Sequence, residues 1–309
     1  MPEEITRIAD TPLSISTYSV ESKPTIMNPP GTLEIIFCLQ GSVRFSYAYE
    51  EFTLHPGEFV SVDKDAYYLY KGTPDNRCIS FIIDLTRYRK THPYIEDMLF
   101  VCEGMAEGTT NYSHHYYDQL KGLMICALQE ITGDGNREVI RRITDRIVDL
   151  FVHHFNICFF HYQSQDIDPL IQQRLNEINH YMYQHISEKI TLEELAGTLG
   201  LSPGYVSEII RKYSIGFRKM LAYLRANMSE RYLLDTDLTI MEISERCGFS
   251  DPKYYYKAFQ GWYLRTPRQF RDRYCRDMAE EIRFLPVEEV KGLLEDLLRT
   301  HYRQIFIKE

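Results

Sequence analysis

The stretch that decides the fold is residues 240–259, IMEISERCGFSDPKYYYKAF. Its first part, through Cys247, has the apolar spacing of a short helix, and Gly-Phe at 248–249 follows as a tight turn. Asp251 and Pro252 then begin a second short helix, since proline at the first helical position loses no hydrogen bond. Two short helices around a glycine turn predict a helix-turn-helix, which aims its second helix at the major groove of DNA.

The same layout occurs about 49 residues earlier in the chain. Thr191 and Glu194 form the capping-box pattern that starts a helix, Gly200 ends it, and Ser202 with Pro203 starts the next one. We expect the buried side of this next helix to carry Tyr205, Val206, Ile209 and Ile210. The chain therefore contains two helix-turn-helix units.

A single long helix, from Phe217 to Leu234, is expected between the two units. Two recognition helices held by such a linking helix can enter successive major grooves on one face of B-DNA, about 34 Å apart. Double-stranded DNA is therefore the first partner that the sequence predicts.

The residues of the second unit closely resemble the signature of AraC/XylS-type transcription regulators. The resemblance is carried by residues 240–271, including Thr266-Pro267, and by Arg225, Leu233-Leu234 and Thr236-Asp237 on the linking helix. The chain departs from the family at Leu264-Arg265, where a glycine usually stands, at Ser244, which replaces an alanine, and in a loop before Phe217 that looks one residue short. The resemblance implies a regulator, more often an activator, that works with RNA polymerase and is controlled by a small-molecule effector.

The rest of the chain predicts an α+β protein. Residues 10–85 alternate short β-branched and aromatic runs with turns, which is typical of a small barrel or sandwich. Helical spacing begins near Tyr112, and a second helix is expected from about Glu138 to Tyr162. With the resemblance, this gives a cupin-like barrel at 1–111, a helical dimerisation element at 112–165, an all-α DNA-binding domain at 166–275 and a helical extension at 276–309. The alternative for the 138–162 helix is packing on its own barrel rather than in a homodimer.

Candidate DNA contacts come from the polar sides of the two recognition helices and the turns beside them. They are Ser202, Ser207, Glu208, Arg211, Lys212, Arg218, Asp251, Lys253, Tyr254, Lys257 and Arg268. Arginine and lysine can bind guanine or phosphate, and Glu208 can accept from cytosine N4. Arg218 and Arg268 are interpreted as phosphate contacts. The alternative is a solvated helix face, with Asp251 stabilised by the helix dipole.

The barrel is expected to hold the effector, a sugar or an aromatic compound, because a barrel mouth is a common ligand site. If alternate residues point inward, the lining consists of Glu34, Cys38, Gln40, Tyr47, Tyr67 and Phe81. The alternative for each is plain barrel core. A metal-dependent cupin enzyme would need clustered ligands, but the chain has no His-x-His, and His55 is the only histidine before residue 92. We therefore expect no metal, no cofactor and no enzymatic activity.

Composition sets further bounds. The net charge of the chain is −9, but the predicted DNA-binding segment is basic. Residues 170–275 hold 15 Lys and Arg against 12 Asp and Glu. The seven scattered cysteines include no C-x-x-C pair, which indicates reduced thiols in the cytoplasm. No signal peptide and no membrane span are expected.

The segment after residue 275 is expected to form one more amphipathic helix from Leu285. Its apolar stripe would consist of Val290, Leu293, Leu294, Leu297, Leu298, Ile305 and Phe306. This stripe could cover the second DNA-binding unit or pair with another subunit. A regulator with a vestigial pocket, controlled by a protein partner through this tail or through the barrel, is the main alternative to effector control.

Overall fold

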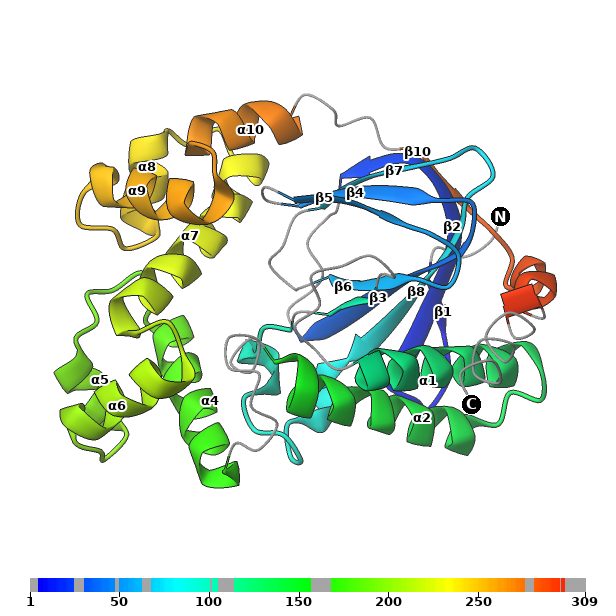
Figure 1. The fold of residues 1–309 in the computed structure, drawn as a ribbon, viewed down its shortest axis with the longest axis horizontal. Helices are drawn as coiled ribbons and strands as arrows, with labels where there is room; N and C mark the ends of the chain where they lie inside the picture. Colours follow the sequence, from blue (N-terminus) through cyan, green and yellow to red (C-terminus); the bar gives the residue numbers. More distant parts are fainter. Residues whose placement is uncertain are drawn as a thin grey trace.

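The structure is a computed structural model that describes residues 5–24, 31–47, 50–62, 68–100, 102–104, 114–156, 168–275, 281–294 and 296–297. A β-barrel with two covering helices occupies one side of the molecule, and a helical domain lies beside it (Figure 1). The fold is mixed α+β, as the sequence predicts.

The strands of the described residues form one antiparallel sheet that curls into a nearly closed barrel. Its order is β5-β4-β7-β2-β8-β3-β6-β9, and β1 and β10 also pair with β2. The strands are β1 (Thr6–Arg7), β2 (Leu13–Pro24), β3 (Thr32–Gln40), β4 (Val43–Tyr47), β5 (Glu50–Leu54), β6 (Phe59–Val62), β7 (Tyr68–Gly72), β8 (Arg77–Asp84), β9 (Glu103–Gly104) and β10 (Glu281–Phe284). The long strand β2 pairs with β8 along its first half and with β7 at its end, so it joins the two halves of the barrel.

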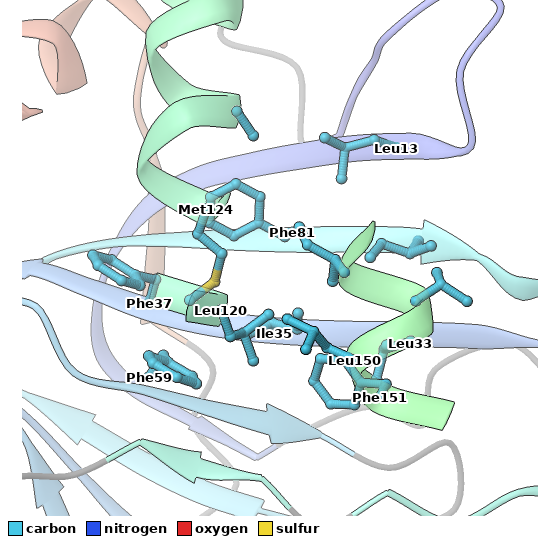
Figure 2. Packing of buried hydrophobic residues seen from close by; sticks show 14 of the residues in the cluster. Leu13, Leu33, Ile35, Phe37, Phe59, Phe81, Leu120, Met124, Leu150 and Phe151 are labelled. Carbon is cyan, nitrogen blue, oxygen red and sulfur yellow. The ribbon is translucent and has the colours of Figure 1, made fainter. Parts of the chain in front are cut away.

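The two faces of the sheet pack against different partners, because successive strand residues point to opposite sides. On β3, Leu33, Ile35 and Phe37 belong to the cluster that packs under the helices, whereas Ile36 and Cys38 belong to a second cluster inside the barrel. Figure 2 shows the first cluster, in which side chains of the strands meet those of the helices. The barrel interior is aromatic, with Tyr18, Phe45, Tyr68 and Tyr70 all buried.

Two helices, α1 (His114–Thr132) and α2 (Arg137–Leu150), cover the outer face of the sheet. The apolar face of α2, with Ile140, Ile147 and Leu150, is buried against the same chain, which is the alternative that the sequence left open for it. The regular helix ends at Leu150 and continues as a π-helical turn, η3 (Phe151–Phe155), instead of running to residue 162. Residues 157–167 lie outside the described part of the chain.

The tail returns to the barrel. Strand β10 pairs with β2, and the Thr17 hydroxyl donates to the Leu285 carbonyl over 2.5 Å. Helical residues follow from 288, and Val290, Leu294 and Leu297 are buried in the cluster that contains α1 and the outer face of the sheet. For this described part of the stripe, both expected partners were wrong, since its apolar side chains pack on the barrel's own helical layer. Leu298, Ile305 and Phe306 of the predicted stripe lie outside the described residues. The sequence analysis missed this strand, although Glu281–Phe284 alternates polar and apolar residues. Four residues are the shortest run in which such alternation indicates a strand.

The helical domain consists of α4 (Pro169–Gln184), α5 (Leu192–Thr198), α6 (Pro203–Tyr213), α7 (Phe217–Asp235), α8 (Ile240–Arg246), α9 (Pro252–Tyr263) and α10 (Pro267–Cys275). It has two apolar clusters. One lies among α4, α5 and α6, the other among α8, α9 and α10, and α7 contributes side chains to both. The long helix α7 is therefore the structural link between the two units (Figure 1).

The helical domain contacts the barrel side of the molecule at two places. Near the first unit, the His180 ring of α4 pairs with the Asp97 carboxylate of the short 3-10 helix η2 (Ile95–Asp97) and lies 4.6 Å from the Tyr94 ring, centroid to centroid. Near the second unit, Leu69 of β7 joins the core of α9 and α10, and Arg273 pairs with Glu51. Neither contact involves the exposed faces of α6 or α9.

Candidate DNA-binding interface

The two units begin with the same cap. Thr191 accepts a hydrogen bond from the Glu194 backbone N–H over 3.2 Å, and the Glu194 carboxylate accepts from the Thr191 N–H over 2.9 Å. Thr239 and Glu242 repeat this capping box with distances of 3.2 and 2.7 Å. The hydrogen bonds from Thr191 and from Thr239 lower the pKa of the two carboxyl groups below the ordinary value for glutamate. Each unit thus starts its first helix at a residue that the sequence marks.

The turns and second helices also match. Gly200 and Gly248 both adopt left-handed backbone angles, with φ of 65° and 78°, which glycine tolerates without strain. The Ser202 hydroxyl then caps α6, and the Asp251 carboxylate caps α9, each directly before a proline at the first helical position. These shared marks put α6 and α9 in the same register, so their residues can be compared position by position.

The spacing between the units is fixed by a close contact. A Cβ atom on Gly248 would lie 2.8 Å from the Ile186 carbonyl oxygen, so only a glycine allows the second turn to approach the first unit so closely. Arg225 of α7 donates to that same carbonyl over 2.8 Å and to the Glu188 carbonyl over 2.5 Å. Arg225 matches the linking-helix arginine of the family resemblance, and here it ties the α4–α5 connection to the long helix.

The second unit has an aromatic core with polar groups inside it. Tyr255, Phe259 and Tyr263 of α9 are buried, and the rings of Phe259 and Tyr263 stack at 4.2 Å. The Tyr255 hydroxyl donates to the Ser229 hydroxyl over 3.0 Å, and the Tyr263 hydroxyl donates to the fully buried Glu230 carboxylate. Burial also raises the pKa of Cys247 to about 12, so this thiol stays protonated.

All the candidate DNA contacts have exposed side chains, and most lie on the outer sides of α6 and α9. The exposed set consists of Ser202, Ser207, Glu208, Arg211, Lys212, Arg218, Asp251, Lys253, Tyr254, Lys257 and Arg268. Arg218 and Arg268 lie outside these two helices, in the first turns of α7 and α10. Ser202 and Asp251 are engaged as helix caps, which leaves them less free to contact a base.

The position of Tyr205 was predicted wrongly. Its side chain is 37% exposed, while Val206, Ile209 and Ile210 fill the interior. Tyr205 lies three residues before Glu208 and therefore shares the outer face of α6. The sequence contained a signal for this exposure, because Tyr254 is the equivalent residue of α9 and was predicted to lie on the polar side of that helix. Tyr256, also 37% exposed, is a further outer-face residue that sequence reasoning missed.

The predicted effector lining is only partly brought together. Cys38 is buried inside the barrel opposite Cys78, and Glu34 lies on the same face of β3, close enough to Tyr18 to help raise the pKa of that phenol, an effect that comes first from burial. Gln40 is at the end of β3 and is half-buried. The inward-facing neighbours that the sequence did not single out are Tyr18, Tyr68, Tyr70 and Ser80.

Phe81 does not face this interior. It pairs with Ile35 across β3 and β8, and both side chains belong to the cluster under α1 and α2 (Figure 2). Directly opposed residues of neighbouring strands share a face, and Phe81 lies opposite Ile35, whose side chain faces the helices. The prediction that Phe81 lines the barrel interior was therefore wrong. Tyr47 is the last residue of β4, but its side chain lies outside the described part of the structure, as does Tyr67 altogether.

Comparison with known proteins agrees with this geometry. Residues 195–273 match the family described as a helix-turn-helix domain. The carboxy-terminal domain is an AraC-type helix-turn-helix domain. The urease operon transcriptional activator of Escherichia coli is 31% identical over 94 residues, which cover 30% of this chain and 32% of that protein. The regulatory protein PocR of Salmonella typhimurium is 33% identical over 94 residues, 30% of this chain and 31% of that protein.

The matched residues span about a third of the length of these curated relatives. Among solved structures, the carboxy-terminal domain of the response regulator AraT from Geobacillus stearothermophilus is 30% identical, with 37% of this chain and 90% of that chain covered and a TM-score of 0.31. The structure of ToxT from Vibrio cholerae with a bound unsaturated fatty acid is 12% identical, with a TM-score of 0.42. The match covers 88% of this chain and 97% of the ToxT chain.

Two features of the described residues bear on other functions. No helix among them has the length and apolar character to cross a membrane. Within the same ranges, no three His, Cys, Asp or Glu side chains come together as metal ligands could.

Proposed function

We propose that the protein is a sequence-specific, DNA-binding transcription regulator whose activity is set by a small molecule in the amino-terminal barrel. The observation that carries this proposal is the pair of helix-turn-helix units on one shared helix. The outer faces of α6 and α9 are both exposed, and both helices lie on the side of the domain away from the barrel (Figure 1). Two such helices can lie in successive major grooves. The barrel side does not cover them, so control by simple occlusion of the DNA face is not what this arrangement supports.

The small positive charge of the helical domain favours sequence-specific DNA binding over non-specific binding. Residues 170–275 carry a formal excess of only three positive charges in a chain of net charge −9. Non-specific affinity comes from phosphate neutralisation, so a small excess gives weak background binding. Binding would then depend on base contacts by residues such as Arg211 and Lys257 and on the correct spacing of the two units.

A direct test is fluorescence anisotropy of the full chain with duplexes from the DNA upstream of its own gene. Arg211→Ala should weaken binding to a selected site by about 1–3 kcal/mol if Arg211 reads a base. Lys291→Ala, which removes an exposed lysine on the tail helix far from α6 and α9, is the matched control and should have no effect. If no duplex shows salt-sensitive, sequence-selective binding, with or without candidate effectors, the proposal fails.

For the effector, the barrel interior favours a polar ring compound, a sugar or an aromatic molecule. The Tyr18 and Ser80 hydroxyl groups, which bond to each other over 3.1 Å, lie among apolar walls. Tyr70 adds a phenol, and Glu34 adds a carboxylate on the same side of the sheet. Thermal shift with a panel of such compounds tests this, with Glu34→Gln expected to abolish a shift that the wild type shows. Phe81→Leu is the control, because Phe81 faces the helices and its replacement should leave ligand binding unchanged.

Activation, contact with RNA polymerase and dimerisation belong to the same proposal. The apolar face of α2 is already used inside the chain, so a homodimer would form through the outer faces of α1 and α2, where Arg141, Arg142 and Arg146 are exposed. Sedimentation of the wild type against a triple Arg→Glu variant at these positions tests the dimer, and a reporter fused to the bound promoter gives the sign of regulation. A wild type that sediments as a monomer on its DNA would remove dimerisation from the proposal.

The alternative of control by a protein partner through the tail loses support, because the apolar stripe of the tail is already buried on the barrel's helical layer. That alternative predicts that the stripe is available for a partner. Control by a protein partner through the barrel stays open. A metal-dependent enzyme, the other alternative, would be revived by stoichiometric iron, manganese or zinc in the purified protein.

A further inference from the structure

The two recognition helices can be compared residue by residue, because two independent marks set their register. A left-handed glycine, Gly200 or Gly248, precedes each helix, and a capping side chain followed by proline begins it. Counting from the capping residue, Val206 and Tyr255 are both buried at the fourth position, and Ile210 and Phe259 are both buried at the eighth. The buried positions coincide, so the exposed positions between them coincide as well.

The sixth position differs in the sign of its charge. It is Glu208 in α6 and Lys257 in α9, and both side chains are exposed in the middle of the outer face. At the fifth position a small hydroxyl, Ser207, corresponds to the exposed aromatic ring of Tyr256. At the third position the two helices are alike, since Tyr205 and Tyr254 are both exposed. The outer faces therefore share a frame but present different chemistry at its centre.

A carboxylate in this place is informative because it is unfavourable beside phosphates. A recognition helix lies between two negatively charged backbones, and a glutamate there is repelled unless it accepts a hydrogen bond from a base. In the major groove, cytosine offers the N4 amino group as a donor, and guanine offers O6 and N7 as acceptors. Lys212, one turn after Glu208, has its ammonium group 5.0 Å from the Tyr213 ring, and the interaction with Tyr213 is the main cause of its raised pKa. The lysine that could neutralise Glu208 within the helix is thus directed mainly to another partner.

We infer that Glu208 and Lys257 are specificity-determining residues of opposite preference, with Glu208 selecting cytosine in the half-site of α6 and Lys257 selecting guanine in the half-site of α9. This inference rests on the proposed function. The DNA site is then directional: its halves are not copies of each other, and the chain binds it in one orientation. The ring of Tyr256 sharpens the difference, since an aromatic side chain can contact the thymine methyl group and the serine hydroxyl at the same position of α6 cannot replace that apolar contact.

The experiment is selection from a randomised duplex library by the full-length protein, followed by sequencing of the bound DNA. For the wild type we expect two unlike half-sites, one with a required cytosine and one with a required guanine. Glu208→Lys should change the preference at one position from cytosine to guanine, and Lys257→Glu should make the reverse change in the other half-site. Each swap should alter discrimination at its own position by about 5- to 100-fold and leave the other half-site unchanged.

Glu208→Gln separates this inference from a merely solvated glutamate. If Glu208 only faces water, its neutralisation raises affinity for all sequences alike and leaves the selected sequence unchanged, which would overturn the inference. If Glu208 reads cytosine, Glu208→Gln weakens the cytosine requirement while it raises background binding. Thermal melting of each variant should match the wild type, because both side chains are exposed. A wild type that selects no sequence would instead contradict the proposed function itself, so the two failures are distinguishable.

Discussion

The first and second helix-turn-helix units share their caps, turns and register, but their interiors are built differently. The first unit is filled mainly by aliphatic side chains such as Ile178, Leu195 and Ile209, whereas the second is filled by stacked rings around the buried Ser229 and Glu230. Aliphatic cores tolerate changes of shape when volume is kept, while buried polar groups require specific partners. The same outer geometry can therefore rest on a core that tolerates substitution or on one that depends on specific polar contacts.

The largest expected effect comes from the centre of the ring stack. Phe259→Ala should lower the free energy of unfolding by about 4 kcal/mol, because the Phe259 ring contacts Tyr255, Tyr263 and Phe270 and its loss leaves a cavity. Ile210→Ala, at the same position of the first unit, should cost about 3 kcal/mol. Urea unfolding of the full chain measures both. An equal or smaller loss for Phe259→Ala would contradict the contrast drawn between the two cores.

The turn glycines give the next largest difference. Gly248→Ala should cost about 3 kcal/mol, because it combines left-handed strain with a Cβ placed 2.8 Å from the Ile186 carbonyl oxygen. Gly200→Ala has the strain alone, since nothing lies within 4 Å of the added Cβ, and should cost about 1 kcal/mol. DNA binding sharpens the test. Gly248→Ala should also weaken affinity for a two-part site by changing the spacing of the units, and equal effects of the two substitutions on affinity would argue against that role.

A smaller effect is expected from the polar groups in the second core. Tyr263→Phe removes the hydroxyl that donates to the buried Glu230 carboxylate and should cost about 2 kcal/mol, because Glu230 is left without that partner. Tyr255→Phe, which removes only the bond to the Ser229 hydroxyl, should cost about 1 kcal/mol and serves as the control. Thermal unfolding followed by circular dichroism separates the two. A Tyr263→Phe variant as stable as the wild type would show that Glu230 does not depend on this bond.

The smallest change is expected to be stabilising. Leu264 ends α9 in a left-handed conformation with φ of 51°, and its side chain is 68% exposed, so it gives little packing in return for the strain. Leu264→Gly should raise the free energy of unfolding by about 1 kcal/mol. The matched substitution Leu201→Gly, at a half-buried residue without positive φ, should destabilise. A fall in melting temperature for Leu264→Gly would mean that its side chain contributes more than its exposure indicates.

The DNA-binding domain was the part most open to prediction, because short-range signals specify it. Capping pairs such as Thr191 and Glu194, and the proline after Ser202, act within one helical turn, so their meaning does not depend on distant residues. Leu264 is a further local signal, because it stands where the family usually has a glycine and its backbone is left-handed.

The barrel was harder to predict, because the face of a strand residue depends on its partner strand. Phe81 was placed inside although its pairing with Ile35 turns it to the helices, and β10 was missed although it completes the pairing of β2. Neither fact can be read from local spacing, since register and strand order are set by long-range contacts. The error at Tyr205 had another origin, because a tyrosine suits both an interior and a DNA-facing surface.

The return of the chain to β2 after α10 makes the DNA-binding domain an insertion within the barrel domain. The chain enters this domain from the helical layer over the barrel and leaves it into a strand of the barrel sheet. A module held at both ends has fewer accessible orientations than one on a single linker. If β2 moved relative to the helical layer, the distance between the two ends of the DNA-binding domain would change, because one end is attached to that layer and the other to β10. It also follows that removing residues after 275 to isolate the DNA-binding domain would damage the barrel domain, because β10 and the buried leucines of the tail are part of it.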